Sequence, residues 1–131
     1  MTKHELSQLY YLNREIVQLQ RRLEELEGLA TSCTQHITGM PMVQGVSDKV
    51  AKYAVEIADL KGILDLNLKR CFYELNRLNR YIQSIDDAQM RMILSLRYIN
   101  GLGWEQVAAS ISSCISGESI RKAHERFLTR N

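Results

Sequence analysis

The sequence is poor in the residues that interrupt helices and in those that cross-link a chain. Its 131 residues include one proline, seven glycines and three cysteines. A chain with so few helix breakers, and with regularly spaced leucine, glutamate, arginine and lysine, is typical of an all-α fold. The odd number of cysteines (Cys33, Cys71 and Cys114) argues against a disulfide framework and predicts a reducing, cytoplasmic compartment.

Long hydrophobic runs and a strong excess of either charge are also absent. No stretch approaches the roughly 18 consecutive apolar residues that a membrane-spanning helix requires. The first 20 residues are polar and periodic, unlike the apolar core of a signal peptide. The net charge of +2 is too small to indicate nucleic-acid binding by itself. We therefore expect a globular cytoplasmic protein that has no contact with a membrane.

Residues 2–27 carry a heptad repeat. Apolar side chains recur at alternating spacings of three and four residues, at Leu9, Leu12, Ile16, Leu19, Leu23 and Leu26. This spacing places them along one face of a helix, as in a coiled coil. Gly28 follows the last of them, at a position where helices commonly end. The pattern predicts a helix over residues 2–27.

Residues 29–47 break this pattern. They are rich in Thr, Ser and Gly and contain Pro41, so we predict a loop that serves as a hinge or has a function of its own. Cys33 and His36 have the spacing of metal ligands within this segment. One cysteine and one histidine do not complete a tetrahedral zinc site, so no metal is expected there.

A longer heptad series predicts a second helix over residues 48–85. Its members are Val50, Tyr53, Ile57, Leu60, Leu64, Leu68, Cys71, Leu75, Leu78, Ile82 and Ile85. The two steps of four residues that lead to Leu68 form a stutter, which relaxes supercoiling. An antiparallel hairpin would bury both heptad faces, but the unequal lengths of the helices favour self-association. Residues 1–85 are thus predicted to be a helical coiled-coil module that forms a homo-oligomer.

From residue 86 onward, three short helical patterns replace the long periodicity, over residues 86–99, 104–111 and 117–129. Asp86 and Asp87 are suited to cap and begin the first of these. The second has an apolar stripe of Trp104, Val107, Ala108 and Ile111, and the third one of Ile120, Ala123 and Phe127. Three short helices with one apolar face each have the size of a small DNA-binding bundle. We predict a helix-turn-helix domain over residues 86–131.

The remaining face of the last predicted helix is basic. Arg121 and Lys122 have the reach to contact guanine edges or phosphates, and Arg126 and Arg130 to contact phosphates. The predicted DNA-binding residues are Ser119, Arg121, Lys122, His124, Glu125, Arg126 and Arg130. Duplex DNA is therefore the expected partner of this helix.

The segments LRYINGLGWEQVAASI and SGESIRKAHERFL resemble region 4 of bacterial sigma factors and the late-gene transcription regulators of Gram-positive phages built on it. The matching positions are Arg97, Tyr98, Gly101, Trp104, Glu105, Val107, Ala108, Ser119, Ile120, Arg121, His124, Arg126 and Leu128. The whole chain also resembles a family of phage and prophage proteins. The resemblance implies a sequence-specific transcription regulator that acts with host RNA polymerase. The turn at residues 112–116 is two residues longer than in the sigma pattern and lacks its usual glycine, which puts the docking angle in doubt.

The sequence contains no pattern typical of catalysis. Its histidines are not placed to form a Ser/His/Asp or Cys/His site, and the turn from Gly101 to Gly103 lacks the preceding strand of a phosphate-binding loop. We therefore expect no enzymatic activity, no cofactor and no small-molecule ligand. Two alternatives to a regulator stay open. They are a DNA-packaging subunit of the phage small terminase type, and an adaptor that binds RNA polymerase without contacting DNA.

Overall fold

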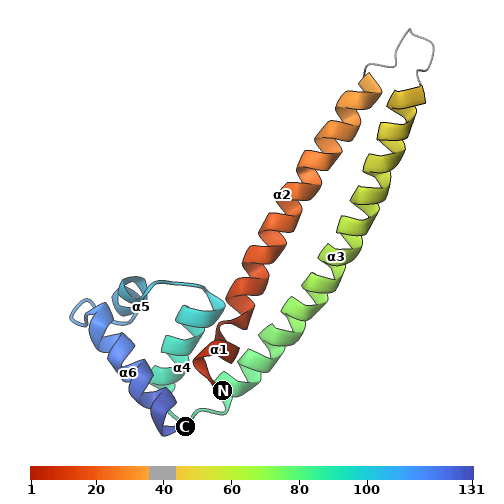
Figure 1. The fold of residues 1–131 in the computed structure, drawn as a ribbon. Helices are drawn as coiled ribbons and strands as arrows, with labels where there is room; N and C mark the ends of the chain where they lie inside the picture. The colour runs from red at the N-terminus through yellow and green to blue at the C-terminus, as the bar shows by residue number, and fades with distance from the viewer. Residues whose placement is uncertain (36–43) are drawn as a thin grey trace. The chain divides into compact units, whose positions relative to one another are not determined.

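A computed structural model describes the backbone of residues 1–35 and 44–131 and the side chains of residues 1–32 and 48–131 (Figure 1). Helices account for most of this backbone, and the described ranges contain no β-strand. The predicted all-α class is therefore confirmed. His36 and Pro41 of the predicted loop, and the side chain of Cys33, lie outside what is described.

The helices follow one another with short connections in the C-terminal half of the chain. Their bounds are α1 (Lys3–Leu6), α2 (Gln8–Gln35), α3 (Gln44–Gln83), α4 (Ala88–Leu94), the π-helical turn η1 (Ser95–Ile99), α5 (Trp104–Ile111) and α6 (Gly117–Arg130). Thr2 begins α1 with a capping box. Its hydroxyl accepts a hydrogen bond from the Glu5 N–H, and the Glu5 carboxylate accepts one from the Thr2 N–H.

The predicted loop at residues 29–47 is too long at both ends. Helix α2 continues to Gln35, and helix α3 already begins at Gln44. Gly28 lies inside α2 and does not end it. A glycine inside a helix costs about 1 kcal/mol relative to alanine. Burial of the neighbouring Leu26 on the inner face of α2 offsets this cost and lets the helix continue.

The described residues group into two compact units. One contains residues 1–13 together with residues 71–131, and the other contains residues 14–70. The units are thus not divided at residue 85, where the heptad series ends. The reason is that the first residues of the chain and the last turns of α3 share a hydrophobic core with the C-terminal helices.

In the unit of residues 14–70, α2 and α3 run antiparallel (Figure 1). The heptad residues of α2 lie on its inner face, where Ile16 and Leu26 are buried. Those of α3 from Val50 to Leu64 are half-buried. An ion pair of 3.7 Å between Lys61 Nζ and Glu27 Oε1 joins the two helices at the surface. The apolar residues of the two series thus make the inner faces of a helical hairpin.

The prediction that Leu68 belongs to the buried series of α3 is wrong. Leu68 is 38% exposed, whereas its neighbour Asn67 is 2% exposed. The reason is helical periodicity. Asn67 follows Leu60 and Leu64 at steps of four and then three residues, which keeps it on the inner face. Asn67 Nδ2 finds no hydrogen-bond partner within the described part of the chain.

The unit of residues 1–13 and 71–131 has one hydrophobic core. Leu94 and Val107 have no exposed surface, and residues from every helix of this unit surround them, including Leu6, Leu9, Leu78, Ile82, Ile85, Met90, Ile93, Tyr98, Ala108 and Ile120. The cap of α4 is Asp87, one residue later than predicted, because its carboxylate accepts a hydrogen bond of 3.0 Å from the Gln89 N–H. The core fixes the positions of α5 and α6, which carry the candidate site.

The N-terminal residues of this unit are tied to α3 by polar contacts. The Arg77 guanidinium donates a hydrogen bond of 2.8 Å to the Glu5 carboxylate. The backbone N–H of Thr2 and then this guanidinium hold the pKa of Glu5 below its usual range. The Cys71 thiol donates to Asn13 Oδ1 at 3.2 Å, and burial raises the pKa of the thiol. Cys71 is therefore a packed, protonated residue of this core.

Candidate nucleic-acid interface

Helices α5 and α6 form where the sequence places them, because each has an N-terminal cap. The Gly103 N–H donates a hydrogen bond of 2.9 Å to Gln106 Oε1 at the start of α5. The Ser116 hydroxyl accepts one of 3.3 Å from the Ser119 N–H at the start of α6. Ser119, a predicted DNA-contacting residue, is exposed in the first turn of α6. Its hydroxyl is also hydrogen-bonded to Ser116, at 3.0 Å.

Gly117 allows the first turns of α5 and α6 to approach closely. A Cβ atom added to Gly117 would lie 2.8 Å from the backbone nitrogen of Glu105. No real side chain tolerates such a contact, so only glycine fits at this position without displacing a helix. The turn at residues 112–116 contains no glycine, and Gly117 directly after it supplies the small residue at this contact. The long serine-rich turn of residues 112–116 leads into this contact.

His124 is not an outward-facing residue of α6, and its prediction as a DNA contact is wrong. The side chain has 0% exposure. His124 Nε2 is hydrogen-bonded to the Tyr98 hydroxyl at 2.8 Å, and its ring lies 5.0 Å from that of Trp104. The physical reason is position. Residue 124 follows the buried Ile120 by four residues and therefore lies on the inner face of α6.

Arg97 holds the turn before α5 in place. Its guanidinium lies over the Trp104 ring, 4.5 Å from the centroid, and donates a hydrogen bond of 2.9 Å to the Leu102 carbonyl. Gly101, with a φ of +71°, supplies the left-handed conformation that this turn needs. Arg97 and Gly101 thus fix the turn that leads into α5, and Trp104 packs against His124 of α6.

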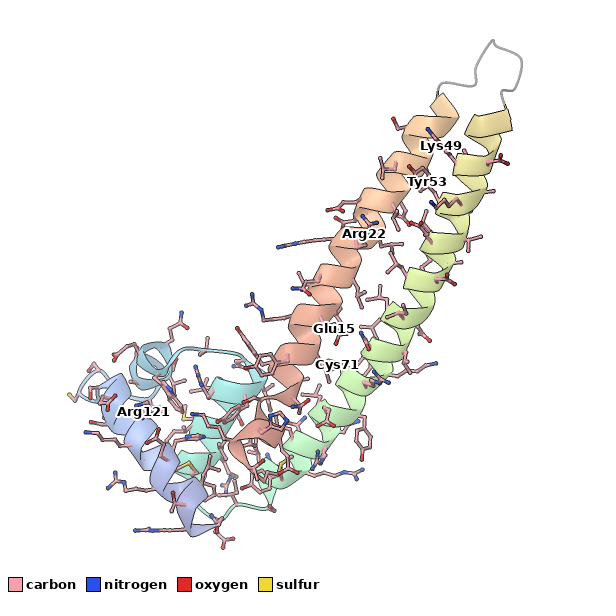
Figure 2. All side chains as sticks on the ribbon, viewed as in Figure 1. Glu15, Arg22, Lys49, Tyr53, Cys71 and Arg121 are labelled. Carbon is pink, nitrogen blue, oxygen red and sulfur yellow. The ribbon has the colours of Figure 1, made fainter. Side chains whose placement is uncertain are left out.

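The outward face of α6 begins with a network of ion pairs. Arg121, which lies on α6 (Figure 2), contacts the Glu118 carboxylate at 2.6 Å and also pairs with Glu125. The hydrogen bond to Glu118, more than any other contact, raises the pKa of the Arg121 guanidinium, and the same bond lowers the pKa of Glu118. Arg121 and Glu125, both predicted contact residues, therefore neutralise each other in part.

Further along α6, three cations form a basic stripe, defined here as Lys122, Arg126 and Arg130. They follow one another at intervals of four residues, and all three side chains are exposed. Arg126 and Arg130 form no ion pair with a described residue, and Lys122 Nζ is 3.9 Å from Glu118. The stripe lines a shallow surface hollow together with Glu125 and Thr129. It is the part of α6 that is open to an anionic partner.

The described side chains suggest no site for metal binding or catalysis. Within residues 1–32 and 48–131, no three His, Cys, Asp or Glu side chains gather in a way that could hold a metal ion. Across the described helices, none is long and apolar enough to cross a membrane. The arrangement on α6 can bind and orient a charged partner, and it contains no nucleophile paired with a base.

No protein-family model matches this sequence, and neither the curated proteins nor the solved structures include a match to it.

Proposed function

We propose that the protein is a sequence-specific DNA-binding transcription regulator in which residues 86–131 form a helix-turn-helix domain. The observation that supports this most strongly is the basic stripe of Lys122, Arg126 and Arg130 on α6. The opposite face of α6 packs on α5 through Ile120 and His124. A helix held by its inner face, with cations on its outer face, has the form of a recognition helix.

In this proposal α6 enters the major groove with its N-terminal half nearest the bases. The major groove is about 12 Å wide and admits one helix. Ser119 and Arg121 would then contact base edges, while Lys122, Arg126 and Arg130 contact phosphates. Lys122 is exposed and its pairing with Glu118 is long, so little has to be broken before it binds an anion. His124 contributes by holding α6 on α5.

Arg121 has a different role from the cations of the stripe. Its guanidinium must leave Glu118 and Glu125 before it reaches a base. A guanine edge offers the two acceptors that a guanidinium binds in a bidentate way, and it can replace these carboxylates. A base without this pair of acceptors leaves the intrahelical ion pairs favoured. Arg121 therefore favours guanine over other bases and adds less to the general affinity for DNA.

The proposal also includes the partners that the sequence motif implies. The resemblance to sigma factor region 4 supports action with host RNA polymerase in the cytoplasm of a bacterial host carrying a phage or prophage. The heptad faces of α2 and α3 support a coiled-coil hairpin, and the chain is proposed to act as a homo-oligomer. A dimeric regulator would bind two half-sites and gain specificity from their spacing.

Fluorescence anisotropy of the full chain on mixed-sequence duplexes, titrated with salt, tests this proposal. We expect binding at low salt that weakens as salt rises, because each phosphate contact by the basic stripe releases counterions. Three phosphate contacts predict a slope of about −3 in a plot of log affinity against log salt concentration. No binding even at low salt would refute the DNA-binding proposal.

The acidic residues on the outward face of α6 favour one second candidate, an adaptor that binds RNA polymerase without contacting DNA. Glu118 and Glu125 lie beside Arg121 and give this part of the helix a mixed charge. Mixed charge suits a protein surface better than a uniform phosphate backbone. A pull-down of purified RNA polymerase with the full chain in the absence of DNA, together with a negative anisotropy result, would support this candidate.

A further inference from the structure

Helix α3 exposes two large apolar side chains on the side away from the hairpin interior. Val55 is 62% exposed and Leu66 is 48% exposed, although Ile57 and Leu60 of the same helix are half-buried. Gly62 lies between Val55 and Leu66 in open space, because a Cβ atom added to it would meet nothing within 4 Å. Large apolar side chains that stay exposed along one helix face indicate a surface that binds another molecule.

This face repeats the heptad spacing of the inner one. Its members are separated by four, three, four and three residues, and we define them as the outer series: Val55, Asp59, Gly62, Leu66 and Lys69. All five are exposed. The spacing is the one by which a helix keeps a single face toward a partner helix. The most direct occupant is therefore another helix that runs along α3.

Four members of the outer series are complementary to one another when its direction is reversed. Gly62 and Leu66 lie two residues on either side of Leu64, and Asp59 and Lys69 lie five residues on either side of it. An antiparallel copy of α3 centred at Leu64 therefore places glycine opposite leucine and aspartate opposite lysine. Each contact then occurs twice, as in the isologous interface of a two-fold dimer.

The neighbouring positions agree with the same arrangement. Ala58 and Arg70 lie six residues on either side of Leu64, and both are exposed. The antiparallel copy places the small alanine opposite the long arginine, so the stem of Arg70 has room to lie along the other helix. Gly62 similarly leaves space for Leu66. Small residues opposite large ones let two helices approach closely without a clash.

We propose that the outer series of α3 is a dimerisation surface that binds the same face of a second copy in antiparallel orientation. Charge complementarity selects this occupant, because Asp59 of each copy lies opposite Lys69 of the other. In the single chain Lys69 Nζ contacts Asp65 at 3.0 Å, and in the dimer Asp59 of the second copy competes for this ammonium group. The inference goes beyond the proposed DNA-binding function and does not rest on it.

Sedimentation velocity of the full chain over a range of concentrations, with a charge-reversal cycle, tests the inference. The variants are Asp59→Lys, Lys69→Asp and the double variant that carries both. Each single reversal places two like-charged pairs in the dimer, and the double variant restores two opposite-charged pairs. We expect the dimer dissociation constant to rise about tenfold in each single variant, because two surface pairs lose attraction and gain repulsion. It should return close to the original value in the double variant.

A matched control is the charge reversal Glu24→Lys on α2, an exposed residue outside the outer series. It should leave the dissociation constant unchanged. Circular dichroism of each variant shows whether the helices are retained, and Leu66→Lys provides a second disruption because Leu66 is exposed in the single chain. A chain that stays monomeric at every concentration overturns the inference. So does a dimer that the single reversals leave intact, or one that the double variant does not restore. DNA affinity is not read in this experiment, so its failure is separate from failure of the proposed function.

Discussion

The Tyr98 hydroxyl lies 2.8 Å from Nε2 of His124, inside the core between η1 and α6. His124 Nδ1 has no hydrogen-bond partner among the described residues. Burial, and secondly the positive charges of Lys3 and Arg97, lower the pKa of His124 to about 4. The histidine is therefore neutral near pH 7 and serves as a packing residue that connects α6 to η1 and α5.

The first prediction concerns the pH dependence of stability. The folded state lowers the pKa of His124 to about 4, whereas in the unfolded state the histidine has its ordinary pKa of about 6.5. As pH falls, the unfolded state therefore takes up the proton first. The contribution of neutral His124 to the free energy of unfolding is complete above pH 6.5. It falls by up to about 3 kcal/mol as pH is lowered toward 4. Urea unfolding at several pH values measures it. His124→Phe keeps a ring in the core and removes the titration, so its stability should vary less with pH in this window. An equal pH dependence in the variant would contradict the assignment.

The second prediction concerns the contact between α5 and α6. Gly117→Ala should lower the free energy of unfolding by about 1–3 kcal/mol, because the new Cβ would overpack against the Glu105 backbone. Gly28→Ala is the matched control. Gly28 is also helical, but nothing lies within 4 Å of its Cβ position. It should stabilise α2 by up to about 1 kcal/mol through helix propensity. Chemical denaturation measures both, and a stabilising Gly117→Ala would show that the helices are not in close contact.

The third prediction separates two neighbouring residues of α3. Asn67→Leu should raise the free energy of unfolding by about 1–3 kcal/mol, because it removes a buried amide without a partner for its Nδ2. Leu68→Asn should lower it by less than about 1 kcal/mol, because Leu68 is largely at the surface. The sequence-based heptad series predicts the reverse order of sensitivity. Thermal and urea unfolding of the two variants therefore decide which residue lies on the inner face.

The fourth prediction concerns the basic stripe. Lys122→Ala and Arg126→Ala should each weaken DNA binding and reduce the salt dependence of log affinity by about one unit of slope, because each removes a phosphate contact. Lys49→Ala, at an exposed lysine of α3 (Figure 2), is the control and should leave the slope unchanged. Anisotropy titrations over a range of salt concentrations measure the slopes. Unchanged slopes in both stripe variants would remove α6 from the proposed interface.

The bounds of α5 and the start of α6 could be predicted from the sequence because local features determine them. The second predicted helix, residues 104–111, agrees with α5, and α6 begins at Gly117 as expected. Gly103 and Ser116 act at the two N-termini, and apolar residues spaced by three and four follow each of them. The predicted loop was too long because Thr, Ser and Gly residues at its two ends are helical in the structure. Packing between α2 and α3 lets both helices continue through such residues.

The burial of two polar residues could not be predicted from residue type. His124 and Asn67 are polar, so the pattern analysis placed the first on the DNA-binding face and left the second out of the buried series. Both lie on the inner faces of their helices. Spacing alone contained the correct answer, because each follows a buried or half-buried residue by three or four positions. Polar character outweighed that spacing in the sequence-based interpretation.

The sequence by itself determined the all-α class, the heptad faces of the long helices and the location of a basic C-terminal helix, since these follow from local periodicity and composition. Tertiary structure decided which cations stay available and which polar residues are buried. Arg121 is paired with Glu118 and Glu125, whereas Arg126 forms no ion pair with a described residue. Spacing along a helix permits these ion pairs and this burial, but the distances between side chains and the contacts between helices decide that they form.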